Sequence, residues 1–205
     1  MGQLVSSLAT IDLTPDDIDV VLLTHMHPDH IGAMVTDGAA TFPNATVRAH
    51  QAEIDYWTSA ETREAAGDGG AAFFDAAEAV IEAYGDRIEP FTGAAEVATG
   101  IVSRELFGHT PGHSGFLIGS GDDQLLVWGD IVHVGPLQFA NPRIGLAFDT
   151  DPAEAIATRE ALLPEVAEAR LRVAGMHISF PGIGHVVAAE EGSFRFEPQV
   201  WQYAL

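Results

Sequence analysis

The chain has 205 residues, of which 47% are hydrophobic, so it is long enough and apolar enough to fold around one sizeable core. It carries 30 acidic residues against 9 basic ones, all arginine, and this net charge of −21 makes nucleic acids and anionic membranes poor partners. Cysteine is absent, which excludes disulfides, thiolate metal sites and cysteine nucleophiles. Residues 1–10 lack the pattern of a signal peptide, and no apolar stretch has the length of a membrane helix, so the chain as written is expected to be soluble and cytoplasmic.

The first half of the chain alternates short helical and strand patterns. Thr14-Pro15-Asp16-Asp17 is typical of a helix start, and the apolar run Val20–Leu23 predicts a strand covered on both faces. The other expected elements are a helix end at 3–9, a short helix at 31–35, a strand at 45–49, a helix at 51–58, a flexible break at 67–70 and a helix at 73–84 that ends at Gly85.

The second half contains more strands. Asp151-Pro152 opens the clearest helix of the chain, at 153–163. The expected strands are 101–106, 116–118, 125–128, 171–174, 186–189 and 194–196. Strands and helices alternate without a repeat or a linker, so we predict one α/β domain over residues 1–205.

The densest chemistry follows the first strand, in Thr24-His25-Met26-His27-Pro28-Asp29-His30. Three imidazoles and a carboxylate lie within six residues, behind a short buried strand that can hold them on a rigid base. The alternative is a polar loop whose histidines face solvent. Imidazole and carboxylate together suit zinc and related ions, so the pattern favours a metal site.

Four later residues also stand where a strand gives way to a loop. His113 ends Gly108-His109-Thr110-Pro111-Gly112-His113, Asp130 ends Trp128-Gly129-Asp130, His177 ends Gly175-Met176-His177, and His185 ends a glycine-rich loop. Individually these signals are weak, because an aspartate there is more often a capping residue and a histidine more often a satisfied core group. Their weight comes from sharing one pattern with the first histidine cluster.

The four motifs THMHPDH, GHTPGH, WGD and GMH together resemble the metallo-β-lactamase superfamily, in the family's order and approximate spacing. The stretches 128–152 and 177–185 resemble the methyl parathion hydrolase-like branch, whose members are binuclear hydrolases of phosphotriesters and lactones. The resemblance covers residues 20–185 and implies the four-layer αββα sandwich of that family.

Carried over to this sequence, the resemblance implies a seven-ligand site for two divalent ions, with zinc the first expectation. It assigns the first ion to His25, His27 and His113, the second to Asp29, His30 and His177, and the bridge to Asp130. Two such ions lower the pKa of a shared water, and the resulting hydroxide attacks an ester, lactone or phosphotriester. Asp29 and Asp130 are therefore also the candidate catalytic residues, with Asp29 handling protons after attack.

Several other residues are candidates for the surroundings of this site. His109 is expected to support the ligands or to stabilise its turn, and His50 is expected to be structural. The candidates for a substrate pocket are Trp57, Phe74, His133, Phe148 and His185. For the aromatic residues the alternative is plain core, and for His185 it is packing beneath its loop.

The resemblance departs from the family at the N-terminus. The family places several strands before the first histidine motif, whereas only 24 residues precede His25. We therefore expect an N-terminally incomplete sandwich, whose exposed sheet edges favour poor solubility or a homodimer. A signal peptide in the missing region would change the compartment, so the localisation stays open.

Two other functions compete with the binuclear hydrolase of small molecules. A glyoxalase II-like thioesterase shares two of the motifs, although that family carries a basic C-terminal helical region and this chain ends differently. A degenerate member that binds metal without turnover is the non-enzymatic alternative. A true β-lactamase fits less well, because common forms of that site use a cysteine and this sequence has none. A di-iron redox protein also fits less well, because such proteins usually have an acidic ligand where this sequence has a histidine.

Overall fold

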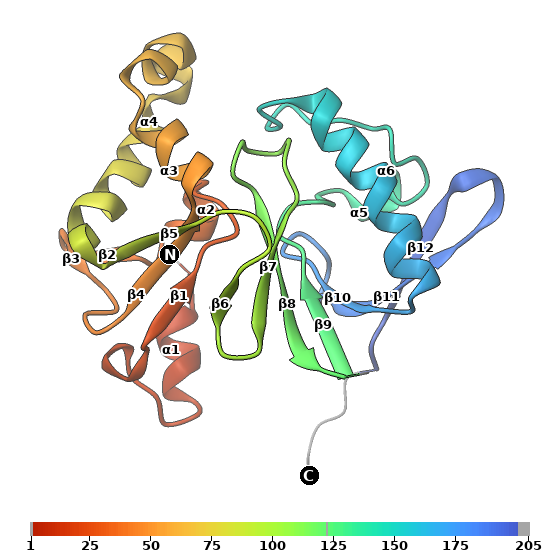
Figure 1. Cartoon of the computed structure of the whole chain (residues 1–205), viewed down its shortest axis with the longest axis horizontal. Coiled ribbons are helices and arrows are strands. Elements are labelled where there is room, and N and C mark those ends of the chain that lie inside the picture. Colours follow the sequence, from red (N-terminus) through yellow and green to blue (C-terminus); the bar gives the residue numbers. More distant parts are fainter. Residues whose placement is uncertain (1, 122, 201–205) are drawn as a thin grey trace. The chain divides into compact units, whose positions relative to one another are not determined.

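The computed structural model describes residues 2–121 and 123–200. The chain divides into two compact units, residues 1–92 and 93–205, and Figure 1 shows helices and strands in both. Within the described residues, no helix combines the length and the apolar character needed to cross a membrane. The single domain expected for residues 1–205 stays a prediction.

The first unit contains a three-stranded parallel sheet in the order β1 (Val20–Leu22), β4 (Thr46–His50) and β5 (Ile88–Phe91), and a small hairpin of β2 (Val35–Thr36) and β3 (Ala39–Ala40). The central strand β4 is the best covered, with Val47 and Ala49 almost completely buried. The strand predicted at Val20–Leu23 is confirmed, but its burial on both faces is wrong. Val20 is 39% exposed, because β1 is an edge strand of this sheet in the described part of the chain.

The helical segments of the first unit are α1 (Leu4–Ala9), η1 (Pro15–Asp17), α2 (Pro28–Ile31), α3 (Gln51–Thr58), α4 (Ala60–Tyr84) and η2 (Gly85–Arg87). The predicted bounds of α3 are confirmed. The helix expected at 31–35 is wrong, because Pro28 already has the fixed φ of a first helical residue and α2 ends at Ile31. Gly67 interrupts α4 with a φ of 60°, at the break that the sequence predicted.

One hydrophobic core joins these helices to the sheet. It includes Ile31 of α2, Val47 of β4, Trp57 of α3 and Phe74 of α4. Tyr84 at the end of α4 donates its hydroxyl to the Met34 carbonyl at 3.0 Å and accepts the Phe42 N–H at 3.2 Å, and burial raises the pKa of its phenol. The residues around the first histidine cluster are therefore packed on a rigid base.

The second unit contains a seven-stranded sheet in the order β12–β11–β10–β9–β8–β7–β6. Its strands are β6 (Glu96–Ala98), β7 (Ile101–Glu105), β8 (Ser114–Ser120), β9 (Asp123–Val127), β10 (Arg172–Ala174), β11 (Ile183–Ala188) and β12 (Phe194–Pro198). Neighbouring strands are antiparallel except β9 and β10, which are parallel. The six strands predicted from the sequence are confirmed to within a few residues, whereas β6 was missed.

The helical segments of this unit are α5 (Gly135–Gln138), α6 (Pro152–Glu168) and η3 (Glu190–Gly192). The predicted end of α6 at residue 163 is wrong, because the helix continues through Pro164. An interior proline costs a helix about 3 kcal/mol. Here Leu162, Leu163 and Val166 are completely or almost completely buried in a core with strand residues, and this packing offsets the cost.

Three loops of the second unit lie at the same side of its sheet, where β9 and β10 end and β8 begins. The parallel strands β9 and β10 are in register at Val127 and Ala174, so Asp130 and His177 follow them at one edge. The antiparallel strand β8 pairs Phe116 with Val127, so the loop that enters β8, with His109, reaches that edge as well. The topology thus explains why residues far apart in sequence converge.

Candidate metal centre

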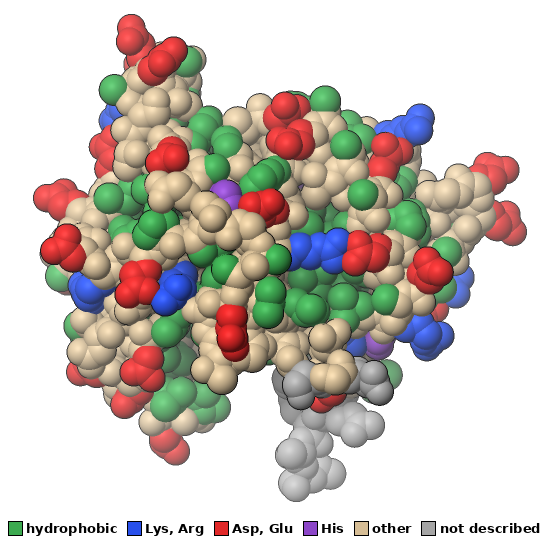
Figure 2. Space-filling view, in the orientation of Figure 1, with side chains coloured by type: hydrophobic (Ala, Val, Ile, Leu, Met, Phe, Trp, Pro, Cys, Tyr) green, Lys and Arg blue, Asp and Glu red, His purple; other side chains and the backbone are tan. Residues whose placement is uncertain are grey.

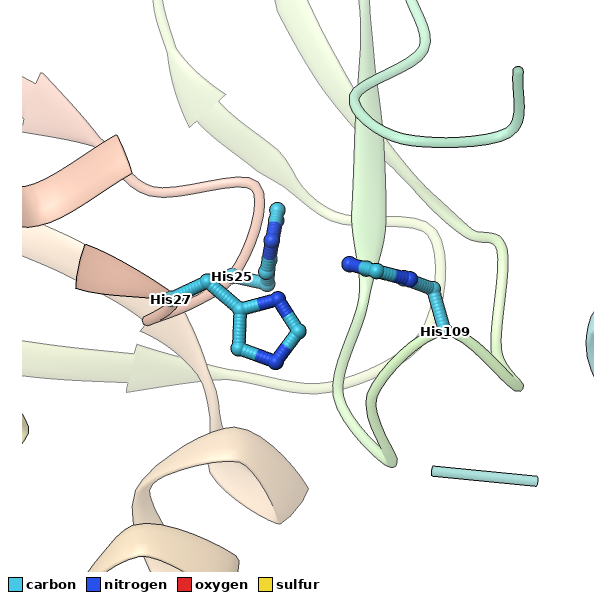
Figure 3. Close-up of side chains that lie close together, drawn as sticks. All are labelled: His25, His27 and His109. Carbon is cyan, nitrogen blue, oxygen red and sulfur yellow. The ribbon is translucent and has the colours of Figure 1, made fainter. Parts of the chain in front are cut away.

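The first group of donors lies on the loop between β1 and α2, where Figure 3 shows His25 and His27, and on α2 itself, which carries Asp29 and His30. Both side chains are buried, and their ring centroids are 4.7 Å apart in a T-shaped arrangement. The ring of His30 lies 4.1 Å from that of His25, and its Nε2 is 3.5 Å from an oxygen of the more exposed Asp29. The structure therefore brings these four predicted ligands together, and we call them the His25 cluster.

A buried glutamate that the sequence analysis missed holds this loop. Glu53 of α3 is 1% exposed, and its Oε1 accepts the Met26 N–H at 2.8 Å and the Trp57 indole N–H at 2.6 Å. Met26 lies between His25 and His27, so this bond fixes the backbone from which both imidazoles project. The only signal in the sequence is a glutamate four residues before a tryptophan on a predicted helix.

The second group of donors surrounds one carboxylate oxygen. Asp130 is 2% exposed, and its Oδ2 lies 3.0 Å from His133 Nε2, 3.1 Å from His177 Nε2 and 3.5 Å from His109 Nε2. We call these four residues the Asp130 cluster. The sequence predicted Asp130 and His177 as ligands, His133 as a pocket residue and His109 as a supporting group.

His109 has the environment of a ligand rather than of a turn residue. Figure 3 shows it on the loop between β7 and β8. Its Nδ1 lies 2.9 Å from Asp149 Oδ1, which favours an Nδ1–H that donates to the carboxylate and leaves Nε2 with a lone pair toward Asp130. Burial opposes the charge of Asp149, but hydrogen bonds from His109 and from the Leu146 N–H outweigh it and lower the pKa of Asp149.

The assignment of His113 as a metal ligand stays a prediction, and the contacts of its ring do not favour it. Its Nδ1 lies 2.7 Å from the Leu106 carbonyl, to which it donates, and its Nε2 accepts the Asp130 N–H at 2.9 Å. Both ring nitrogens contact the backbone, so the structure gives them roles in holding the main chain. His113 instead positions the main chain of Asp130, and His109 takes its place among the candidate ligands.

The loop after Asp130 is held by two buried polar residues that sequence reasoning also missed. Arg159 of α6 is 1% exposed and donates to the carbonyls of Ile131 at 2.6 Å, Pro142 at 2.8 Å and Ile144 at 2.9 Å. Burial lowers the pKa of its guanidinium, opposed by the charge of Asp149. The completely buried Gln138 accepts the His133 N–H at 2.8 Å. Neither residue stands in a recognisable sequence pattern.

The remaining pocket candidates have different environments within their own units. Trp57 and Phe74 are buried with ring centroids 4.8 Å apart, which favours the plain-core alternative. Phe148 is exposed. His185 pairs with Arg172 at the start of β10, the end opposite to His177, so the structure separates it from the Asp130 cluster. His50 accepts the Ala52 N–H at the start of α3, as expected of a structural residue.

The donor set fits a divalent metal ion. Donors about 2.0–2.2 Å from one ion lie roughly 3.0–3.5 Å apart at ordinary coordination angles, and zinc accepts imidazole and carboxylate together. The distances from Asp130 Oδ2 to the three imidazole nitrogens, 3.0, 3.1 and 3.5 Å, match that spacing. Among these residues, donor atoms of His109, Asp130 and His133 all lie within 4.8 Å of one another, which is close enough for them to bind one ion.

Comparisons with known proteins agree with this chemistry. The family model described as "Metallo-beta-lactamase superfamily" matches residues 2–177. The solved structure of hydrolase AbOPH, in the beta-lactamase superfamily, is 29% identical, with 99% of this chain and 72% of that chain covered and a TM-score of 0.90. The dizinc quorum-quenching lactonase AidC is 26% identical, with 99% and 71% covered and a TM-score of 0.90.

A third solved structure, a probable metal-dependent hydrolase from Staphylococcus aureus, is 25% identical, with 98% of this chain and 70% of that chain covered and a TM-score of 0.75. No curated protein shows a significant match to the sequence. The similarity thus extends over nearly the whole chain in all three structures.

Proposed function

The chain belongs to the metallo-beta-lactamase superfamily and is a metal-dependent hydrolase with that family's fold, and from this premise we propose that it uses two divalent ions, zinc first, to hydrolyse a lactone, ester or phosphotriester. The observation that carries the proposal is the Asp130 cluster, in which three imidazole nitrogens lie 3.0–3.5 Å from one buried carboxylate oxygen. The His25 cluster supplies further imidazole and carboxylate donors, from the motif at residues 24–30.

The proposed ligand set follows the family pattern with one change from the sequence assignment. His109 replaces His113, whose ring nitrogens contact the backbone. By the family pattern, His25, His27 and His109 would hold one ion, Asp29, His30 and His177 would hold the other, and Asp130 would serve both. When bound, two such ions supply a water of lowered pKa and a Lewis acid for the carbonyl or phosphoryl oxygen of the substrate.

The residues of the chain itself have separate tasks in this proposal. Asp149 holds the tautomer of His109 that offers Nε2 to an ion, and Glu53 fixes the backbone between His25 and His27. His113 holds the backbone of Asp130. These bonds keep the ligands in place before metal arrives, which lowers the reorganisation that binding would otherwise require.

A cavity of about 420 Å³ beside His177 favours a substrate with an apolar part. Its walls include Phe139, Phe180 and Phe196, and His177 of the Asp130 cluster lines it too. AidC, which is 26% identical, is a lactonase whose structure holds the product N-hexanoyl-L-homoserine. We therefore place lactones with an apolar acyl group first among the substrates.

The test is a substrate panel on zinc-loaded protein: an acylated lactone, an aryl ester, a phosphotriester and a glutathione thioester. We expect lactone turnover that is abolished in Asp130→Ala, together with loss of bound metal, while Asp68→Ala on the exposed surface of α4 behaves as wild type. Turnover of the thioester alone would favour the glyoxalase II-like alternative. Full metal loading without any turnover would overturn the hydrolase in favour of a metal-binding protein.

A further inference from the structure

His133 is the member of the Asp130 cluster that the proposed ligand set leaves without a task. It follows Asp130 by three residues, and its Nε2 lies 3.0 Å from Asp130 Oδ2. The corresponding distance for the proposed ligand His177 is 3.1 Å, and that for His109 is 3.5 Å. By distance alone, His133 is placed as well as either proposed ligand.

The surroundings of His133 also resemble those of a coordinating imidazole. Donor atoms of His109, Asp130 and His133 all lie within 4.8 Å of one another. The ring of His133 is stacked on that of His177, with centroids 4.5 Å apart and planes at 16°, and it lies 4.7 Å from the ring of His109. His133 thus stands between two other imidazoles, all directed at one carboxylate oxygen.

The backbone of His133 is held by hydrogen bonds, and its ring packs against the rings of His109 and His177. The Oε1 of Gln138 accepts the N–H groups of His133 and Val134 at 2.8 and 3.1 Å, and Gln138 donates its own amide to the Ile144 carbonyl at 3.0 Å. The other ring nitrogen of His133, Nδ1, is buried and makes no hydrogen bond within the described part of the chain. The ring is therefore directed by what lies at Nε2.

We propose that His133 is a metal donor, and that His109, Asp130 and His133 form a cation site contained entirely within residues 93–200. The proposal rests on the metal dependence of the proposed function but goes beyond its seven ligands. Two imidazoles and one carboxylate are a common set of protein ligands for a zinc ion that keeps one coordination position open. Here all three ligands come from one unit. It follows that a first ion binds to these three residues without any donor of the His25 cluster, and that two ions load with unequal affinity.

The test uses Co²⁺ as the probe, titrated into metal-free full-length protein with visible absorption and calorimetry as readouts. The variant His25→Ala/His27→Ala removes donors of the other cluster and is expected to keep one ion per chain. Adding His133→Ala to it should weaken that ion at least about 10-fold and change the d–d absorption, because a ligand is lost. The matched control is His185→Ala on the same background, since this histidine lies at the other end of β10.

A second variant separates coordination from a supporting hydrogen bond. His133→Gln keeps an amide N–H that can donate to Asp130 Oδ2 but removes the imidazole. If His133 only orients Asp130, His133→Gln will retain the Co²⁺ affinity and the spectrum of its parent, and the proposal is overturned. A double variant His25→Ala/His27→Ala that binds no ion also overturns it. If both tests go against His133 but the wild-type protein binds two ions, the proposed function still stands and only the role of His133 is refuted. If the wild-type protein binds no metal, the proposed function and the role of His133 are both refuted.

Discussion

Glu53 offers a sharp test of how the first unit holds its histidines. Its carboxylate is buried and accepts both the Met26 N–H at 2.8 Å and the Trp57 indole N–H at 2.6 Å. In Glu53→Ala both donors lose this acceptor inside the core. A buried donor left without a partner costs about 1–3 kcal/mol, so the two together predict a loss of roughly 2–6 kcal/mol in the free energy of unfolding.

The assay is urea denaturation of metal-free protein, so that metal binding does not contribute to the measured stability. Glu53→Gln keeps the Oε1 acceptor and is expected to lose about half as much or less than Glu53→Ala. The control is Glu64→Ala on the exposed face of α4, where a surface substitution stays within about 0.5 kcal/mol. If Glu53→Ala is no less stable than this control, the argument that Glu53 fixes the His25–His27 backbone is wrong.

Three further predictions concern the second unit. His109→Ala should lose at least one bound zinc, whereas His113→Ala should keep its zinc content at saturating metal but unfold at lower urea. Elemental analysis measures the zinc and urea denaturation measures the stability, and zinc loss in His113→Ala but not in His109→Ala would contradict the prediction. Arg159→Met removes a buried guanidinium from three carbonyls and should cost about 3 kcal/mol or more in urea, while a loss below about 1 kcal/mol contradicts its role. Glu165 is half exposed, and a hydrogen bond from Arg104 lowers its pKa below the ordinary 4.5, so its stabilisation exists above that value and disappears as pH falls through the folded pKa. Glu165→Gln should therefore lose less than about 1 kcal/mol at pH 7 in thermal melts, and this loss should shrink as the pH falls below 4.5, whereas a loss that does not change with pH would refute the ionic origin.

Much of the candidate site follows from local sequence pattern. The His25 cluster is contiguous, and Asp130 and His177 each follow an apolar strand, so a reader of the sequence can place them at strand ends. Parallel pairing of β9 and β10 then brings Asp130 and His177 together at one edge. Helix α3 was predictable to the residue, because the sequence after β4 changes at once to a helical pattern.

The choice between His109 and His113 was not predictable, because both stand in one short motif and their roles are set by distant partners. Asp149, which directs His109, lies forty residues further along the chain. His113 is disfavoured only by its contacts with the Leu106 carbonyl and the Asp130 N–H, which depend on how β8 and β9 pair. Pattern gives the candidate ligands, and tertiary hydrogen bonds decide among them.

Residues that support the clusters were missed for a different reason. Glu53, Gln138 and Arg159 are polar side chains that would ordinarily be placed on the surface, yet each is 1% exposed or less. Their burial is tolerated because each makes at least two hydrogen bonds, including one or more to a loop that carries the donors. Nothing in composition or periodicity distinguishes such residues from solvent-exposed ones.

The central claim is that this chain holds two divalent ions through the His25 and Asp130 clusters. The most direct measurement is the metal-to-protein ratio of gently purified protein, with each element identified and with zinc added back to a metal-free sample. The account predicts close to two zinc-like ions per chain, falling in Asp130→Ala. A ratio near zero that zinc does not restore would contradict it.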